Sequence, residues 1–195
     1  MIRGNKVVLR DIRDGDIEVM TAWRNDPQVN KYFFEYEPVS YEKEKLWVES
    51  LRERKDEKLF IIAPLENPDR AIGTVGLVRI DHRNKKAEWG RFQLGDSSSR
   101  GQGLAAEAIY LSLQYAFDHL NLRRIYLEVF AWNDRARSLY ESFGFKIEGT
   151  YRAHIYREGT YHDVAIYGLL EHEFRKNEQK IRERLRSIEV EYDKP

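Results

Sequence analysis

The sequence predicts a single α/β domain. Segments with the alternation of β-strands are interspersed with segments of helical periodicity along the chain. The 195 residues, 42% of them apolar, suffice for one well-filled core and hardly for two. No internal repeat or low-complexity linker divides them. We therefore expect one domain over residues 1–195.

The N-terminal part predicts one strand followed by helices. Its expected elements are a strand over residues 6–12, a helix that begins after Asp14-Gly15-Asp16, a short helix from Asp26-Pro27 and a helix over residues 40–55. Residues 31–38 between the helices form an aromatic and acidic loop. So many aromatic residues are unusual in a mere connection, and the loop either caps the core or lines a substrate pocket.

Three strands are expected next, over residues 59–63, 71–78 and 86–94. The alternation of the third strand is irregular. One inserted residue near Gly90-Arg91 would place Trp89, Phe92 and Leu94 on one face, which predicts a β-bulge. A central strand that is buried on both faces is the alternative, because such a strand needs no alternation.

A polar turn with two glycines follows this strand and opens a long apolar helix from Gly101 to about Leu120. Gly101 and Gly103 allow a ligand to approach the backbone closely. The first amides of a helix have no internal partner and favour phosphate, to which Arg100 adds a forked cationic donor. The turn therefore predicts a pyrophosphate site.

Gly101-x-Gly103-x-x-Ala106 also satisfies a dinucleotide fingerprint, but that motif is weak here. Residues 95–100 separate the glycines from the strand, and too little chain follows for the rest of such a sheet. A nucleoside-triphosphate loop is excluded, because no Gly-Lys-Ser or Gly-Lys-Thr occurs.

The C-terminal part completes the sheet. Its expected elements are a strand over residues 125–130, a helix over residues 133–143 that Gly144 ends, a hairpin of strands over residues 146–156 and 161–170, and a charged helix from Glu171 to about Glu191 within residues 171–195.

Composition narrows the function. Thirty-three basic residues balance 33 acidic ones, so the basic excess of a nucleic-acid-binding protein is missing. Cys is absent, which excludes disulfides and a cysteine nucleophile, and the five His residues lack metal-ligand spacing, so no metal is expected. Since neither a signal peptide nor a membrane span is visible, we expect a cytoplasmic protein.

Two motifs resemble those of the GNAT N-acetyltransferases. Arg100-x-x-Gly103-x-Ala105 matches the Arg/Gln-x-x-Gly-x-Gly/Ala motif of this family, and residues 133–145 (NDRARSLYESFGF) match its Asn-x-x-Ala-x-x-Leu-Tyr-x-x-x-Gly-Phe segment. The resemblance is clearest over residues 71–170, the expected cofactor-binding and catalytic core; residues 14–55 fit the variable substrate-binding part. Residues 71–76 (AIGTVG) and 159–163 (GTYHD) resemble the branch of the family that includes ribosomal-protein, spermidine and nucleotide-linked amino-sugar acetyltransferases.

The resemblance implies a mixed, mostly antiparallel sheet of about seven strands flanked by helices. It also implies acetyl-CoA as the donor. Backbone groups of Phe92, Gln93 and Leu94 would pair with the pantetheine arm, and an amide of Gln93 or Leu94 freed by the bulge would polarise the thioester carbonyl. The pyrophosphate would be held by Arg100, Gly101, Gln102, Gly103, Leu104, Ala105 and Ala106, with Asn133 as a further cofactor contact.

Tyr140 is the expected catalytic acid, because a phenol of pKa ~10 can protonate a departing thiolate whose conjugate acid has a pKa of ~8.5. The alternative is a core tyrosine on the apolar face of its helix. Glu88, at the start of the bulged strand, is a candidate base that acts through water. We expect the acceptor amine to contact Phe33, Phe34, Glu35, Tyr36, Glu37 and His154.

The acceptor is open between a protein N-terminal amine, a polyamine and a nucleotide-linked amino sugar. A non-catalytic acetyl-CoA-binding module is a further possibility, although such a module has no need of Tyr140. A dinucleotide-binding reductase is the remote alternative. Neither nucleic acid nor membrane is an expected partner, and a homodimer or larger homo-oligomer is compatible with the sequence.

Overall fold

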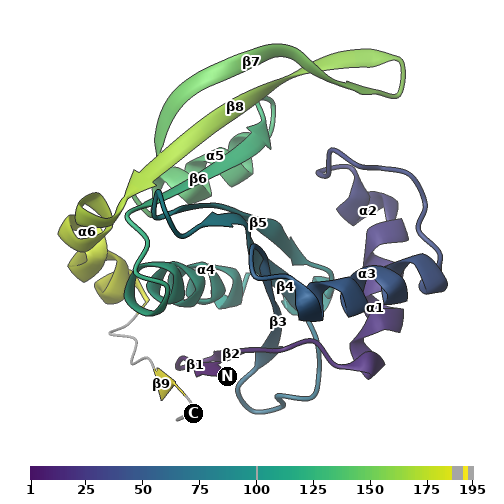
Figure 1. Ribbon diagram of the computed structural model, residues 1–195, viewed down its shortest axis with the longest axis horizontal. Coiled ribbons are helices and arrows are strands. Elements are labelled where there is room, and N and C mark those ends of the chain that lie inside the picture. The colour runs from purple at the N-terminus through teal and green to yellow at the C-terminus, as the bar shows by residue number, and fades with distance from the viewer. Residues whose placement is uncertain (100, 186–190, 193–195) are drawn as a thin grey trace.

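The computed structural model describes residues 1–99, 101–185 and 191–192. One mixed sheet lies at its centre (Figure 1). Its strands lie in the order β7-β8-β6-β5-β4-β3-β2-β1-β9. Their bounds are β1 Ile2–Arg3, β2 Val7–Arg10, β3 Lys58–Pro64, β4 Gly73–Asp81, β5 Lys86–Leu94, β6 Arg124–Phe130, β7 Lys146–Arg157, β8 Thr160–Leu170 and β9 Glu191–Tyr192. Apart from β1 and β9, which have two residues each, seven longer strands form the sheet, as expected.

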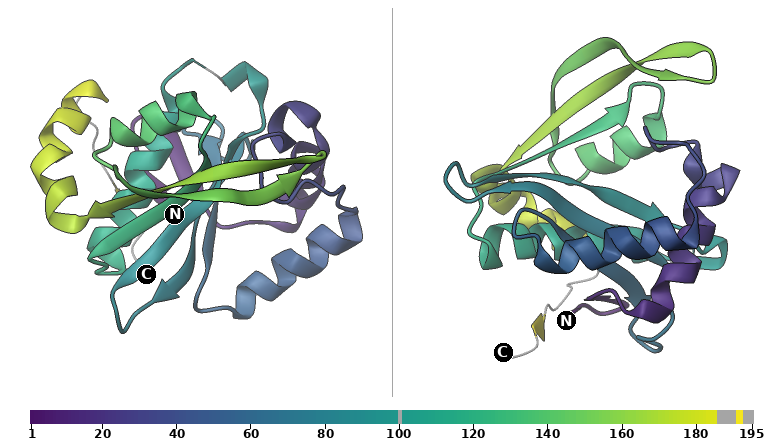
Figure 2. Two further views of the ribbon diagram at one scale, coloured as in Figure 1. Left: turned by 90° about the horizontal axis from the view of Figure 1, so that it is seen from above. Right: turned by 45° about the vertical axis from the view of Figure 1, so that its right-hand side comes forward.

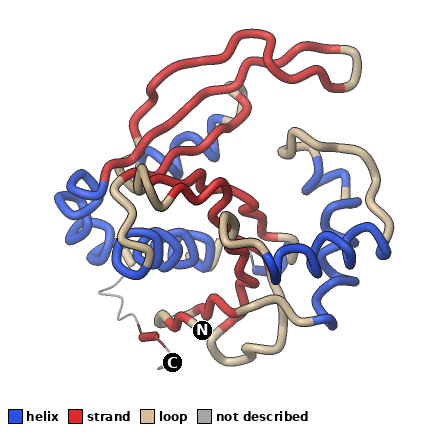
Figure 3. The backbone as a smooth tube through the Cα atoms, in the orientation of Figure 1, coloured by secondary structure: helices blue, strands red, loops and turns tan. Residues whose placement is uncertain are grey.

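Helices cover both faces of the sheet (Figures 2 and 3). Their bounds are α1 Ile17–Asn25, α2 Pro27–Asn30, α3 Tyr41–Glu53, α4 Leu104–Gln114, α5 Asp134–Glu141 and α6 Glu171–Arg184. In β3, Phe60 and Ile62 belong to the large core that α4, α5 and α6 complete, whereas Leu59 and Ile61 belong to a smaller core with α1 and α3. Successive residues of a strand point to opposite faces, so one strand serves both cores.

The sheet opens between β5 and β6. This is the one parallel pair among the described strands, and it is short: Lys86 to Glu88 pair with Arg124 to Tyr126. Beyond these residues the two strands diverge, and the β6-β8-β7 part of the sheet rises away from the β5-β4-β3 part (Figure 1). The edge of β5 that faces β6 therefore lacks a strand partner, among the described residues, from Trp89 to Leu94.

The structure corrects three expected elements. The helix from Glu171 ends at Arg184 rather than near Glu191, and residues 191–192 form β9 against β1, a strand that the sequence did not predict. Val190 and Tyr192 alternate with glutamates, which is the pattern of a strand. The strand was not predicted because the whole segment is highly charged and was assigned to the helix. The helix after the glycine turn is regular only from Leu104 to Gln114 and continues as a π-helical turn.

Candidate active site

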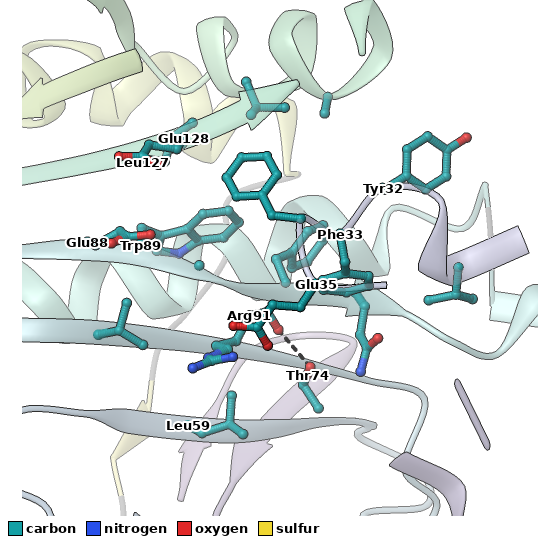
Figure 4. A pocket seen from close by; sticks show the side chains of 18 of the residues that line it. Tyr32, Phe33, Glu35, Leu59, Thr74, Glu88, Trp89, Arg91, Leu127 and Glu128 are labelled. Carbon is teal, nitrogen blue, oxygen red and sulfur yellow. Dashed lines mark hydrogen bonds between the residues drawn. The ribbon is translucent and has the colours of Figure 1, made fainter. Parts of the chain in front are cut away.

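A cavity of about 670 Å³ lies where β5 and β6 diverge (Figure 4). Residues 89–94 of β5 line one side of it, and residues 127–129 of β6 line the other. Residues of α5, of the loop after α2, and of α1, α3, β3 and β4 form most of the rest of the wall. The expected donor strand, catalytic helix and substrate loop therefore meet at one cavity, although they lie far apart in the sequence.

The predicted β-bulge is present in β5. Gln93 pairs with Thr74 and Gly90 with Gly76, so Arg91 and Phe92 together lie opposite Val75. Arg91 adopts the left-handed backbone conformation, with φ at 54°. The rings of Trp89 and Phe92 consequently come to the same side, with centroids 5.2 Å apart.

Side chains from β4, from α3 and from the segment before β3 hold the bulge. The hydroxyl of Thr74 donates a hydrogen bond of 2.7 Å to the Arg91 carbonyl (Figure 4). The Arg91 guanidinium pairs with Glu57 at 3.2 Å and lies over the ring of Trp47. Glu57 is buried and pairs with Arg54 as well. The strained backbone of Arg91 is thus fixed at both its carbonyl and its side chain.

The glycine turn has the geometry of an anion site. Gly101 and Gly103 both have φ at 80°, and Gly103 is the N-cap of α4. A Cβ atom on Gly103 would lie 3.4 Å from the ammonium of Lys6, which itself donates to the Gln102 carbonyl at 3.0 Å. The turn therefore combines free helix amides with a nearby cation. Arg100 lies outside the described residues.

The remaining expected cofactor residues surround the same region. Ala105 and Asn133 line the cavity together with Phe92, Gln93 and Leu94. The Asn133 side chain caps α5 by accepting the Ala136 amide at 3.2 Å. The Oε1 atom of Gln93 is buried and has no hydrogen-bond partner within the described part of the chain. An unpaired buried oxygen beside a cavity is available to a ligand. Leu104 is buried in the main core, and the partly buried Ala106 packs against that core.

Tyr140 lies at the wall of the cavity with 9% of its surface exposed. Its ring packs edge-on against Trp89, with centroids 5.5 Å apart, and also against Phe145. Burial raises the pKa of Tyr140, so the phenol keeps its proton. Tyr140 is therefore both a core residue and a protonated donor that faces the cavity.

Glu88 lines the cavity on β5, and Glu128 faces it from β6 (Figure 4). Burial raises the pKa of Glu88; Arg79, paired with it at 2.6 Å, opposes this effect, and the nearby Glu128 adds to it. A carboxylate with a raised pKa is a stronger proton acceptor than an exposed one. Arg79 reaches Glu88 from a second bulge, in β4, where its φ is 52°.

The structure divides the expected substrate residues. Phe33, Phe34 and Glu35 line the cavity, Phe34 against Phe130 with ring centroids 4.9 Å apart. Tyr36 lines a smaller cavity behind the loop. Glu37 is exposed, and His154 lies exposed on β7 against Tyr151; neither lines either of the two cavities as far as the chain is described.

Tyr32 of the expected loop also lines the cavity, and four further lining residues were not predicted from the sequence: Glu44, Glu57, Thr74 and Glu128. Glu44 is the most unusual of them, because its side chain is 1% exposed and its Oε1 atom has no hydrogen-bond partner within the described residues. Burial raises the pKa of Glu44, against the opposing effect of Arg24. Helical spacing placed Glu44 on the apolar stripe beside Trp47, which was the available signal.

Neither a metal-binding group nor a membrane-spanning helix occurs among the described residues. No group of three or more acidic or histidine side chains is arranged to hold a metal ion. None of the helices there combines the length and the apolar character needed to span a bilayer.

Known proteins match the chain over most of its length. The family model described as acetyltransferase (GNAT) domain matches residues 6–146. The spermidine N(1)-acetyltransferase of Escherichia coli (strain K12) is 29% identical over 177 residues, which cover 89% of this chain and 91% of that protein. A putative ribosomal N-acetyltransferase of Bacillus subtilis, YdaF, is 32% identical over 102 residues, 52% of this chain and 55% of that protein.

Solved structures match as well. Spermidine N-acetyltransferase from Vibrio cholerae in complex with CoA and spermine has a TM-score of 0.78 and 29% identity, and the match covers 86% of this chain and 97% of that chain. A structure of the same protein described as dodecameric has a TM-score of 0.71 and 27% identity over 86% of this chain and 95% of that chain.

Proposed function

This chain belongs to the GNAT acetyltransferase family and is an acetyl-CoA-dependent N-acetyltransferase, and from this premise we propose that its acceptor is a polyamine. The observation that carries the proposal is the similarity to spermidine N-acetyltransferases over 86–89% of the chain. The relative named for ribosomal acetylation matches a much shorter part.

In the proposed complex, the donor lies between the glycine turn and the bulged strand. The amides of residues 101–106 and the Arg100 side chain bind the pyrophosphate, and the unpaired edge of β5 at residues 92–94 pairs with the pantetheine arm. Asn133 contacts the cofactor from the start of α5. The two positive-φ glycines, the free strand edge and the unpaired Gln93 oxygen all support this arrangement.

The proposed reaction is direct attack in a ternary complex. The neutral acceptor amine attacks the thioester carbonyl, a C–N bond forms, and the C–S bond breaks. An amide freed by the bulge, at Gln93 or Leu94, stabilises the oxyanion, and Tyr140 gives its proton to the leaving thiolate. As the attacking nitrogen becomes an amide it loses a proton, which restores the phenol of Tyr140. The place of Tyr140 in the wall of the cavity, against Trp89 of the bulged strand, supports this role.

Glu88 is the proposed base. It takes the excess proton of the acceptor ammonium through water, and Arg79 keeps its carboxylate oriented. Its raised pKa and its place in the wall of the cavity support this role.

The lining of the cavity suits an extended cation better than a nucleotide sugar. Tyr32, Phe33 and Phe34 offer ring faces for cation–π contacts. Glu35 and Glu128 add carboxylates to the lining. Three arginines of the lining pair with acidic side chains and so offer less free charge to a second phosphate; the pairs are Arg24–Glu35, Arg79–Glu88 and Arg91–Glu57.

A competition assay tests the acceptor. The purified protein is given acetyl-CoA with an equimolar mixture of spermidine, a peptide with a free N-terminus and a UDP-linked amino sugar, and products are separated by mass. We expect acetylspermidine to dominate. A dominant acetylpeptide would refute the polyamine and favour the protein N-terminal amine, and absence of any product would favour a non-catalytic acetyl-CoA-binding module.

We further propose that the protein forms a homo-oligomer, as the dodecameric relative does. Light scattering tests this state directly, and a monomer at micromolar concentration would contradict it.

A further inference from the structure

One buried arginine at the tip of the β7–β8 hairpin forms hydrogen bonds to the loop after α2. Arg157, the last residue of β7, is 8% exposed. Its Nη1 atom donates to the carbonyls of Asn30 and Phe33 at 3.0 and 2.7 Å, and its Nη2 atom donates to Asn30 Oδ1 at 2.9 Å. In Figure 1 the hairpin extends from the sheet over the side of the molecule where α2 lies. The contact joins segments more than 120 residues apart.

The guanidinium is fully engaged on its other sides. Its Nε atom donates to Glu158 at 3.1 Å, and its plane lies 4.8 Å from the ring centre of Tyr36. The other hydrogen bonds of the loop are made within it or to α1 and α2. The Phe33 amide donates to the Asn30 carbonyl at 2.9 Å, and Asn30 Nδ2 donates to the Arg24 carbonyl at 2.9 Å and to the Tyr36 carbonyl at 3.4 Å. Arg24 also pairs with Glu35 at 3.6 Å, and Asn25 binds Val39 at the far end of the loop. Arg157 therefore supplies the three hydrogen bonds that tie residues 30 and 33 to the hairpin.

The same loop forms part of the main cavity. Tyr32, Phe33, Phe34 and Glu35 line that cavity, whereas Arg157 and Tyr36 line the smaller cavity behind the loop. Arg157 thus stands outside the proposed acceptor site, and it can affect the acceptor only through the position of the loop. The carbonyl that it binds most closely belongs to Phe33, the residue whose ring faces the acceptor side.

We infer that Arg157 is a positioning residue for acceptor recognition: it holds residues 30–36 in the conformation that presents their rings and Glu35 to the amine. The inference rests on the proposed acceptor role of this loop. A lysine cannot replace Arg157, because two carbonyls and an amide oxygen need a forked donor set. Removal of the guanidinium leaves those oxygens unpaired and lets the loop relax.

Steady-state kinetics of Arg157→Ala and Arg157→Lys test the inference, with Arg152→Ala on the exposed part of the same hairpin as the control. We expect the KM for spermidine to rise about tenfold or more in both Arg157 variants, while the Kd for acetyl-CoA stays near the wild-type value. Arg152→Ala should change neither. A lower kcat with an unchanged KM for spermidine would overturn the inference. So would a loss of acetyl-CoA affinity equal to the rise in that KM.

Fluorescence supplies a readout that mere loss of stability does not move. The Tyr32 ring lies 5.9 Å from that of Trp132, which is itself half exposed, so movement of the loop changes the emission of Trp132. We expect a changed Trp132 emission in Arg157→Ala at temperatures where the fold is intact, with Trp132→Phe as the blank. Unchanged emission together with an unchanged KM for the amine would contradict the inference.

The acceptor proposal and this inference fail separately. If the wild-type protein acetylates a peptide N-terminus rather than spermidine, the polyamine proposal is wrong, and the same comparison of Arg157 variants is made with that peptide. A KM for the peptide within about twofold of the wild-type value in Arg157→Ala would then overturn the inference as well.

Discussion

The ring of Tyr140 stands edge-on to the indole of Trp89, with centroids 5.5 Å apart. Trp89 is in turn fixed by a hydrogen bond of 2.8 Å to the buried hydroxyl of Ser112 in α4. The helix that carries the proposed acid is therefore tied to the strand that carries the bulge, and through it to the helix that begins at the glycine turn.

Tyr140→Phe tests the proposed acid. The ring contacts with Trp89 remain, while the proton donor is lost. We expect kcat to fall about 100-fold and the Kd for acetyl-CoA to stay near the wild-type value. Kinetics and calorimetry measure the two quantities. A large loss of acetyl-CoA affinity with an unchanged kcat would instead make Tyr140 a structural residue.

The pH dependence of the rate tests Glu88. A base must be ionised to accept a proton, and burial raises the pKa of Glu88, so activity should fall as the pH decreases through that raised value. Glu88→Gln should lower kcat/KM and remove this acid limb. Arg79 lowers the pKa of Glu88, so Arg79→Ala should move the limb to higher pH. An acid limb that persists in Glu88→Gln would assign the base elsewhere.

Gly103→Ala tests the anion site. Alanine is disfavoured at φ 80°, and its Cβ atom would lie 3.4 Å from the Lys6 ammonium, beside the free amides. We expect the Kd for acetyl-CoA to rise about tenfold and the free energy of unfolding to fall by about 1 kcal/mol. Gly149→Ala is the control, because its nearest neighbour would lie 3.9 Å away and its φ is ordinary. Equal Kd values in both variants would refute the site.

Thr74→Val tests whether the bulge aligns the donor. The variant keeps the shape of the side chain and removes the bond to the Arg91 carbonyl. An unpaired carbonyl costs about 1–3 kcal/mol, so we expect Arg91 to shift and kcat to fall about tenfold. Thr74→Ser keeps the hydroxyl and should retain most of the activity. Wild-type kcat in Thr74→Val would show that the bulge does not depend on this bond.

Much of the fold followed from local patterns. The irregular alternation of Trp89, Phe92 and Leu94 predicted the bulge, because each of those side chains must choose one face of the sheet. Gly101 and Gly103 predicted the helix start for the same local reason, their conformational freedom. The long hairpin and the α5 segment also lie where turn residues placed them.

The contacts that hold the site together could not be predicted in this way. Thr74 and Glu57 act on Arg91 through strand register, and Arg157 reaches Phe33 across 124 residues. Nothing in the neighbouring sequence distinguishes the buried Arg157 from the exposed charged residues of the hairpin. The exposure of His154 could not be predicted either, because its position in an alternating strand does not show that most of β7 is exposed on both faces.

The most direct test follows the acetyl group. The protein is mixed with acetyl-CoA labelled in its acetyl carbons and with spermidine, and both the polyamine and the intact protein are weighed within a single turnover. The account predicts one labelled acetyl group on spermidine and none on the protein, in step with the release of free CoA. Labelled protein that then passes its acetyl group to spermidine, or release of CoA with unmodified spermidine, would contradict it.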